Sequence, residues 1–375
     1  MQHDGGRGGN GIGGSNLVPA DGQMNRVDHA GRPMGKRLSE LVFTDLYISH
    51  TGEVLIKGAM DDERPVKVAD DFAIADLHDI LQILLREQDR HADTGEFRVE
   101  YDNINYRVTV MEDIDETWFT LRRPMSEIPR LSKLGAFNAP MMRFMGWLGR
   151  QTSPGLVLIA GRTGHGKTTT AYSLLREYLK SYGDIAVTIE DPPEMRFKEG
   201  DFPFGKCFQL TLKPGQTFGQ RLVQSLRMSP KYIFIGELRR GSDASEALRH
   251  AGSGHLILTT IHAGNVIEAV NSFIKLASSE GVSEGFVRDL FAQSISAIIH
   301  QEIQTVKSGT RFMKKLKLET LFFSAEDHAA RSLIREGKTS QLNTLIAQQA
   351  SLMSKNEDPT DYLGKKAIAN KDGRR

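Results

Sequence analysis

The residues best suited to chemistry lie between positions 161 and 169. Gly161-Arg162-Thr163-Gly164-His165-Gly166-Lys167-Thr168 fits the pattern Gly-x4-Gly-Lys-Ser/Thr, and Thr169 follows it. Glycines at these spacings let backbone N–H groups close around phosphate oxygens, and the N-terminus of a following helix adds positive potential. Lys167 would reach the β- and γ-phosphates, and the Thr168 hydroxyl would bind Mg²⁺. The segment therefore predicts a site for ATP and Mg²⁺ formed by residues 161–169.

The sequence on both sides of this loop strengthens the prediction. An apolar run, Leu156–Ala160, precedes the loop. After the loop, apolar residues recur at the spacing of one helix face: Ala171, Leu174, Leu175, Tyr178 and Leu179. A phosphate-binding loop requires this strand–loop–helix order. The alternative, a glycine-rich turn with a solvated lysine, does not account for it.

Two further apolar runs lead to acidic residues. Ile185–Ile189 is followed by a short segment that contains Glu194. Tyr232–Ile235 is followed, after one glycine, by Glu237. Ligands of open α/β sheets bind at the carboxyl ends of strands, and phosphoryl transfer to water needs one acid near Mg²⁺ and another to orient or deprotonate the water. We assign Glu237 to Mg²⁺, together with Thr168, and Glu194 to the base; the alternative is a solvated turn carboxylate at either position.

Two histidines flank a fourth apolar run. His255 precedes Leu256–Ile261 and His262 follows it, so the two side chains belong to opposite ends or faces of a strand. A lone histidine is more often structural than functional. His262, however, would lie at the carboxyl end of its strand, near the γ-phosphate, and is a candidate phosphate sensor.

The apolar runs also indicate the fold class. Four short and nearly continuous runs, at 156–160, 185–189, 232–235 and 256–261, are separated by helical patterns. Runs of this kind are typical of parallel strands that are buried on both faces. We therefore expect an α/β ATPase domain with C-terminal helices at 135–345, followed by a flexible C-terminal tail at 346–375.

The N-terminal third follows a different pattern. Leucines and isoleucines between 77 and 85 recur at helical spacing, and two alternating runs at 97–101 and 106–110 flank Asp102-Asn103, which predicts a β-hairpin. We expect a smaller α+β domain at 38–125. A flexible glycine-rich tail at 1–37 would precede it, and a linker at 126–134 would follow it.

Composition narrows the class of protein. A length of 375 residues suits two domains. The chain has 48 Lys and Arg against 47 Asp and Glu, so its net charge of +1 disfavours a protein that coats nucleic acid. The single cysteine, Cys207, excludes an intramolecular disulfide and a cysteine-based zinc site. Because the sequence shows neither a long apolar run nor a signal peptide, we expect a cytoplasmic protein without a transmembrane segment.

Four of these segments, in this order, resemble the motif boxes of the type II/IV secretion system ATPase superfamily. Gly161–Thr168 is similar to its Walker A box, and Thr188–Glu194 to its Asp box. Leu226–Arg239 is similar to its Walker B box, and Gly254–His262 to its His box. Outside them, Thr44–Ile48 resembles an N-terminal signature of the superfamily, and Ala330–Lys338 resembles a segment of the pilus-retraction ATPases. The branch of pilus-retraction, Dot/Icm and conjugation ATPases is therefore indicated, over residues 38–345.

The resemblance implies a RecA-like ATPase domain and a PAS-like N-terminal domain in a homo-hexameric ring. ATP would bind between the two domains, and arginines of the N-terminal domain would complete the site. The Arg-x-Arg pattern of the family falls on Asn105-Tyr106-Arg107, so only Arg107 is kept, and Arg122 is a further candidate. Lys231 and Arg240 stand where the family usually has acids, but neither change affects Glu237, so activity is expected.

These observations favour an ATP-hydrolysing motor for a bacterial type IV secretion, conjugation or pilus-retraction machine. The resemblance implies that it is peripheral to the inner membrane and acts on membrane platform proteins, and we expect no direct contact with nucleic acid. Two alternatives stay open. One is a RecA-like ATPase that translocates nucleic acid, which the neutral charge disfavours. The other is a nucleotide-gated adaptor without hydrolysis, which the presence of Lys167, Glu194 and Glu237 disfavours.

Overall fold

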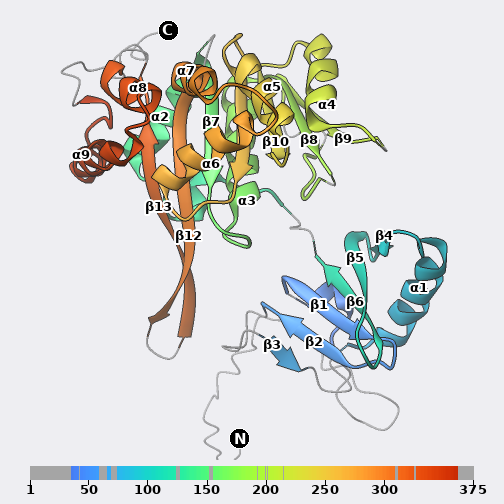
Figure 1. The fold of residues 1–375 in the computed structure, drawn as a ribbon. Coiled ribbons are helices and arrows are strands. Elements are labelled where there is room, and N and C mark those ends of the chain that lie inside the picture. Colours follow the sequence, from blue (N-terminus) through green and yellow to red (C-terminus); the bar gives the residue numbers. More distant parts are fainter. Residues whose placement is uncertain are drawn as a thin grey trace, which may run out of the picture. The chain divides into compact units, whose positions relative to one another are not determined.

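The chain folds as two units, Met1–Arg123 and Pro124–Arg375 (Figure 1). The computed structural model describes residues 35–41, 43–58, 66–68, 74–123, 127–151, 155–191, 193–198, 200, 202–213, 215–308, 311–324 and 327–361. Most of the tail predicted at 1–37 and the last part of the tail predicted at 346–375 lie outside the described residues. Residue 126, the first of the predicted linker, lies outside them as well.

The first unit is built on an antiparallel sheet with strand order β3-β2-β1-β6-β5-β4. Ile80 and Leu84 of its helix pack into one core with strand residues such as Phe97, Val108 and Phe119. The unit is therefore an α+β fold. Its elements are η1 (Leu38–Glu40), β1 (Asp45–Ser49), β2 (Val54–Lys57), β3 (Val66–Val68), α1 (Leu77–Arg90), β4 (Glu96–Tyr101), β5 (Ile104–Glu112) and β6 (Thr117–Arg122).

Strands β4 and β5 form the hairpin that the alternating runs predict. The turn residues Asp102 and Asn103 have φ angles of 49° and 61°, the left-handed conformation that a tight two-residue turn requires. Short polar side chains tolerate this conformation better than other non-glycine residues. The turn fixes a register in which Arg98 lies opposite Arg107. The predicted hairpin is confirmed.

The second unit contains a larger sheet, with strand order β13-β12-β7-β11-β10-β8-β9. Every neighbouring pair is parallel except β12 with β13. The strands are β7 (Gly155–Ala160), β8 (Asp184–Glu190), β9 (Gly205–Thr211), β10 (Tyr232–Glu237), β11 (Leu256–Ile261), β12 (Ile295–Ser308) and β13 (Arg311–Phe322). The four apolar runs are β7, β8, β10 and β11, so the prediction of a parallel α/β sheet is confirmed.

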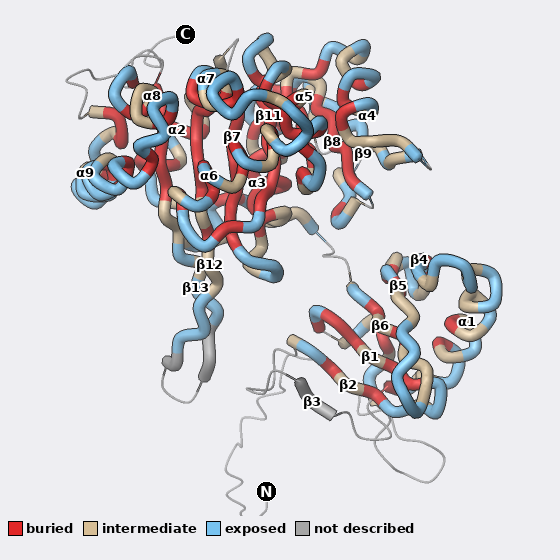
Figure 2. Tube along the Cα trace, in the orientation of Figure 1, coloured by how far each residue is buried: buried red, intermediate tan, exposed pale blue. Residues whose placement is uncertain are grey.

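Helices cover both faces of this sheet, which explains why its central strands have no polar alternation. In β7, Leu156 and Leu158 belong to one core and Val157 and Ile159 to the other, and the whole strand is buried (Figure 2). Helices α2 (Ala139–Arg150) and α3 (Lys167–Tyr182) contribute to the second core. Helices α4 (Phe218–Ser225), α5 (Gly241–Ala251), α6 (Val266–Ser278) and α7 (Glu284–Ser294) contribute to the first.

Strands β12 and β13 are longer than their neighbours. Residues 295–300 of β12 pair with β7, and the rest of the strand continues with β13 as a two-stranded ribbon beyond the sheet (Figure 1). The ribbon leaves the sheet at the carboxyl end of β7. It therefore passes the loop that follows β7 and contacts it, as described below.

Two predicted boundaries are wrong. The C-terminal tail does not begin at 346, because α9 (Leu342–Ser354) continues across this position and buries Met353, after α8 (His328–Arg335) and η4 (Thr339–Gln341). The end of the predicted linker is also structured, because η2 (Leu131–Leu134) buries Leu131 in the second unit. In both places a few apolar side chains outweigh the polar residues around them. Within the described residues, no helix has the length and apolar character needed to span a membrane.

Candidate nucleotide-binding site

The phosphate loop lies between β7 and α3, as the sequence predicts. Gly161, Gly164 and Gly166 have φ angles of 153°, 79° and 80°, which side-chain-bearing residues rarely adopt. Gly166 occupies the N-cap position of α3, with no side chain capping the helix. The first backbone N–H groups of α3 are therefore not satisfied by a capping side chain, and such groups bind phosphate oxygens well.

Strand β12 supports the loop from the side. The Gln301 amide donates to the His165 carbonyl oxygen at 2.6 Å, and the Ile303 backbone N–H donates to Nδ1 of His165 at 3.1 Å. A Cβ atom on Gly161 would lie 2.5 Å from the Gln301 carbonyl oxygen, so only glycine fits there. The sequence predicts the loop but not this support, because Gln301 lies far along the chain and carries no local signal.

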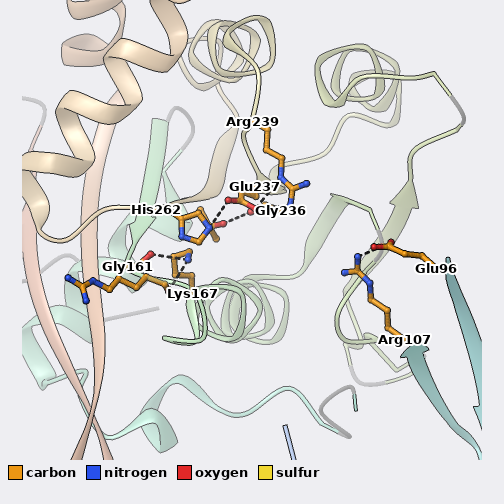
Figure 3. A network of polar contacts seen from close by, with 10 residues as sticks. Glu96, Arg107, Gly161, Lys167, Gly236, Glu237, Arg239 and His262 are labelled. Carbon is orange, nitrogen blue, oxygen red and sulfur yellow. Dashed lines mark hydrogen bonds and ion pairs between the residues drawn. The ribbon is translucent and has the colours of Figure 1, made fainter. Parts of the chain in front are cut away.

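Lys167 begins helix α3 and is turned back over the loop. Its ammonium donates to the carbonyl oxygens of Gly161 at 2.9 Å and Arg162 at 3.2 Å (Figure 3). The residue is only 9% exposed. Burial lowers the pKa of the Lys167 ammonium, and the carboxylates of Glu237 and Glu194 act in the opposite direction. Both predicted acids are therefore close enough to influence this ammonium.

Glu237 ends β10 and is the centre of a charged cluster. His262 Nε2 lies 2.8 Å from one of its carboxylate oxygens, and the Arg239 guanidinium lies 3.2 Å from the other (Figure 3). Neighbouring parallel strands β10 and β11 carry Glu237 and His262 to the same edge, which explains their contact. The structure thus brings together Lys167, Glu237 and His262, as predicted, and adds Arg239 as a partner of the acid.

A pocket of about 350 Å³ lies beside this cluster. Its lining includes Arg162 and Thr163 of the loop and His262 after β11. A volume of this size is at the lower end of the range for small-molecule sites. Thr168 and Thr169 lie in the first turn of α3, where the Thr168 hydroxyl and the Glu237 carboxylate offer the hard oxygen ligands that Mg²⁺ prefers. The residues present therefore fit a nucleotide with Mg²⁺.

The second predicted acid, Glu194, follows β8 in an irregular segment. Its side chain is exposed, whereas its neighbour Met195 is buried. Strand β8 pairs with β10, so the segment after β8 leaves the sheet at the same edge as Glu237. This position is suitable for a carboxylate that would orient or deprotonate a water molecule.

Glu190, the last residue of β8, is a polar residue to which the sequence analysis gives no role. Its carboxylate is 3% exposed and accepts a hydrogen bond from the Tyr172 hydroxyl at 2.5 Å. Burial raises the pKa of Glu190 to about 7, although the bond from Tyr172 opposes this shift. The sequence shows a carboxylate at the end of a predicted strand, but it does not show that this carboxylate is buried.

His255 belongs to the opposite end of β11. Its Nδ1 lies 2.7 Å from the carbonyl oxygen of Pro230, and its ring packs edge-on against His250. Both contacts are structural. The two flanking histidines therefore differ, because only His262 lies next to the acid cluster.

The two candidate arginines of the first unit lie side by side. Arg107 of β5 is directly opposite Arg122 of β6 in the sheet register. Arg107 forms an ion pair with Glu96 at 3.2 Å, and Arg122 forms one with Asp45 at 2.7 Å. Both arginine side chains are about half exposed, at 44% and 58%. The first unit thus presents two adjacent guanidinium groups on one face of its sheet.

The sequence matches one protein family and several curated relatives. The family model described as "Type II/IV secretion system protein" matches residues 87–362. The chain is 31% identical over 194 residues to the competence protein ComGA of Bacillus subtilis, which is 52% of each protein. It is 31% identical over 241 residues to the uncharacterized protein YggR of Escherichia coli, covering 62% of this chain and 68% of YggR. Its match to ComGA therefore spans about half the length of that relative.

Solved structures show the same fold. The pilus retraction motor PilT with bound ADP superimposes with a TM-score of 0.64 at 24% identity, covering 86% of this chain and 94% of PilT. The ATPase DotB of Legionella pneumophila superimposes with a TM-score of 0.64 at 22% identity, covering 82% of this chain and 84% of DotB.

Proposed function

Because the chain belongs to the type II/IV secretion system protein family, we propose that it is an ATP-hydrolysing motor of a bacterial type IV secretion, conjugation or pilus-retraction system. The observation that carries this proposal is the meeting of Lys167, Glu237 and His262 at the carboxyl edge of the parallel sheet (Figure 3). The three residues come from the ends of neighbouring strands or from the helix after the phosphate loop. Their arrangement suits phosphoryl transfer, which depends on positioning and on charge stabilisation.

Each part of the loop has a role in binding ATP. The backbone N–H groups of residues 161–169 would hold phosphate oxygens, and the Lys167 ammonium would exchange its carbonyl partners for the β- and γ-phosphates. Thr168 and Glu237 would hold Mg²⁺. When bound, Mg²⁺ neutralises charge on the phosphate oxygens during transfer. The bonds from β12 to His165 would keep the loop in its binding conformation.

The remaining side chains would act on water and on the γ-phosphate. Glu194 is the proposed base, since it is exposed beside the carboxyl edge of the sheet and its charge reaches Lys167. Glu237 is held from two sides by His262 and Arg239, which would orient its carboxylate for binding Mg²⁺. His262 would then sense the γ-phosphate, because its ring contacts both Glu237 and the pocket.

The same family relationship supports a homo-hexameric ring with a PAS-like first unit. We propose that Arg107 and Arg122 supply positive charge to the nucleotide in the assembled ring. Their placement opposite each other on β5 and β6 supports a shared role. The ring would work in the cytoplasm at the inner membrane and would pass its motion to platform proteins of the secretion or pilus machine, with no direct contact with nucleic acid.

Phosphate release from ATP, measured for the purified full chain with and without Mg²⁺, tests the proposed function. The wild type should hydrolyse ATP only with Mg²⁺, and Lys167→Ala should show no turnover above background. Lys180→Ala is the matched control, because Lys180 is an exposed lysine on the same helix. Turnover of Lys167→Ala at the wild-type rate, or absence of turnover in the wild type, contradicts the proposal.

The composite site has its own test. An arginine that stabilises the transferring phosphate contributes roughly 10³–10⁵ to the rate. Arg107→Ala together with Arg122→Ala should therefore hydrolyse ATP at least about 10³ times more slowly while binding ADP normally. Arg90→Ala on α1 controls for the loss of an exposed arginine. A double variant with full activity would exclude these arginines from the site.

A further inference from the structure

One side chain, Gln209 of β9, holds the backbone of the segment that carries Glu194. Its amide nitrogen donates to the Met195 carbonyl oxygen at 2.7 Å, and its amide oxygen accepts from the Phe197 N–H at 2.9 Å. These two bonds satisfy a backbone acceptor and a backbone donor on either side of residue 196. A segment without regular secondary structure is therefore fixed by one side chain next to Glu194.

The clamp continues to helix α3 through Tyr172. The Gln209 amide also donates to the Tyr172 hydroxyl at 3.1 Å, and that hydroxyl donates to Glu190 at 2.5 Å. The Tyr172 ring is stacked on Phe197 at 5.2 Å and meets Phe234 of β10 edge-on. The Tyr172 ring thus contacts the segment at Phe197, and its hydroxyl links Gln209 to Glu190.

Glu190 is the third member of this set of contacts. The backbone of Glu194, four residues later, lies close enough to the Glu190 carboxylate to favour its ionised form. Glu190 also lies against Gly236, where a Cβ atom would come within 3.3 Å of the Glu190 Cγ atom. The acid is therefore packed between the segment of the proposed base and the residue before Glu237.

We infer that Tyr172, Glu190 and Gln209 form a positioning network that sets the place of the Glu194 carboxylate relative to the phosphate loop. The inference rests on the proposed function. Tyr172 and Gln209 lie outside the four motif boxes, and Glu190 lies within the Asp-box segment without a role assigned to it there. None of the three side chains needs to touch the nucleotide. They act through Glu194.

The position of Tyr172 on α3 gives the network a route to the nucleotide. Tyr172 lies four residues after Thr168, about one helical turn, so the two residues share one face of the helix. A small shift of α3 on nucleotide binding would move the Tyr172 hydroxyl, and with it Glu190 and Gln209. Closely packed interiors transmit such shifts with little loss.

The charges around Glu190 fit a positioning role. The titratable groups that influence it are Tyr172 on α3 and Glu194 in the following segment, and Cys207 on β9 is influenced by it in turn. Tyr172 is buried and Cys207 is partly buried, and burial raises the pKa of both side chains, so both are neutral at physiological pH. Glu194 is thus the charged side chain that acts on Glu190.

The test uses two conservative variants of the full chain. Tyr172→Phe removes the hydroxyl and keeps the ring stacked on Phe197, and Gln209→Met removes the clamp at similar length. Tyr178→Phe is the matched control, because Tyr178 is a buried tyrosine of the same helix whose hydroxyl has no hydrogen-bond partner among the described residues. Three quantities are measured: kcat and KM for ATP hydrolysis, the affinity for a fluorescent ADP analogue, and hydrogen exchange of the peptide covering 191–198.

If the network positions Glu194, the variants should change kcat and hydrogen exchange but not KM or ADP affinity. Tyr172→Phe and Gln209→Met should lower kcat by about 10- to 100-fold, because misplacing a reacting group by about 1 Å has effects of this size. ADP affinity and KM should stay within about threefold. Exchange in 191–198 should become faster, since the Phe197 N–H loses or weakens its acceptor. Tyr178→Phe should match the wild type in all three.

Other results overturn the inference. Unchanged exchange in both variants shows that the network does not hold the segment. Faster exchange with unchanged kcat assigns it a structural role only. Equal loss in Tyr178→Phe attributes the effect to general disturbance of α3. If the wild type shows no turnover that depends on Lys167, the proposed function itself fails, and faster exchange then leaves the three residues with a structural role alone.

Discussion

The phosphate loop would bind the nucleotide, and the segment from 190 to 198 carries the proposed base. The conformations of these two regions are determined in different ways. In the loop, three glycines with left-handed backbone angles and the start of α3 specify the turn locally. In the second segment, the conformation depends on Tyr172 and Gln209, which come from a helix and a strand elsewhere in the fold.

This difference explains which parts of the site are visible in a sequence. A conformation that the residues of the loop impose on themselves leaves a short motif. A conformation imposed by distant side chains leaves no pattern, because a partly buried glutamine on an edge strand has no characteristic spacing. The loop also has one distant support, since Gln301 of β12 donates a hydrogen bond to it.

The largest loss of activity and stability is expected at Gly161, where both the local backbone angle and the contact with β12 require glycine. Gly161→Ala forces an alanine into φ 153° and places its Cβ atom 2.5 Å from the Gln301 carbonyl oxygen. The backbone angle alone costs roughly 1–3 kcal/mol, and the backbone contact cannot be relieved by a rotamer change. We expect ATP hydrolysis to be lost and the free energy of unfolding to fall by more than this amount, as measured by phosphate release and urea denaturation.

Gly164→Ala separates the two causes. Gly164 has a φ of 79°, but a Cβ atom there meets nothing within 4 Å. Its loss of unfolding free energy should therefore be limited to the cost of the backbone angle. Equal losses in the two variants would show that contact with β12 does not constrain the loop.

The next largest effect concerns the acid of the second region. Glu194→Gln should lower kcat by roughly 10²–10⁴, the usual contribution of a general base, while ADP binding stays unchanged. Glu237→Gln should instead raise the Mg²⁺ concentration needed for half-maximal activity. Rate measurements across a Mg²⁺ titration distinguish the two.

Asp191→Asn controls for the loss of an exposed negative charge in the same segment. It should keep most of the activity. If Asp191→Asn loses as much activity as Glu194→Gln, the base is assigned to the wrong acid or the effect is a general one of charge.

Sequence alone predicts much of the second unit because its central strands are buried on both faces. A short, continuous apolar run such as Leu156–Ala160, followed directly by a glycine-rich loop, is typical of a buried parallel strand. Edge strand β9 is not predicted in this way, because it has no continuous apolar run: Lys206 and Phe208 are exposed and Gln209 is partly buried. The sequence also does not predict helix α9, because the basic end of the chain suggests a solvated tail and Met353 gives only a weak apolar signal.

Within the site, the sequence predicts Lys167, Glu237 and His262 together because each directly follows a recognisable strand or loop. It does not predict the partners that hold them. Arg239 is placed against Glu237 by the turn after β10, and the buried Glu190 carboxylate accepts a hydrogen bond from the Tyr172 hydroxyl. The first contact is local and the second is tertiary, but neither pair of residue types is distinctive enough in the sequence to be recognised before the fold is known.

The last expected effect, on stability rather than on turnover, concerns the charge of Glu190. Burial raises its pKa from the ordinary value of 4.5 to about 7. Between these two pH values the folded protein keeps a proton that the unfolded chain has released. Stability from this group is therefore present at low pH and is lost as pH rises through 7. At about 1.4 kcal/mol per pKa unit, the loss amounts to about 3 kcal/mol.

Glu190→Gln cannot titrate, so its free energy of unfolding relative to the wild type should improve by up to about 3 kcal/mol between pH 5 and pH 8. The chain has two tryptophans, Trp118 in the first unit and Trp147 in the second. A Trp118→Phe background therefore lets Trp147 fluorescence follow urea unfolding of the second unit alone. Glu357→Gln, at an exposed position after α9, controls for the change in net charge. A difference between Glu190→Gln and the wild type that does not change with pH would mean that Glu190 is ionised in the folded protein throughout this range, and that its burial beside Tyr172 is offset by the hydrogen bonds it accepts.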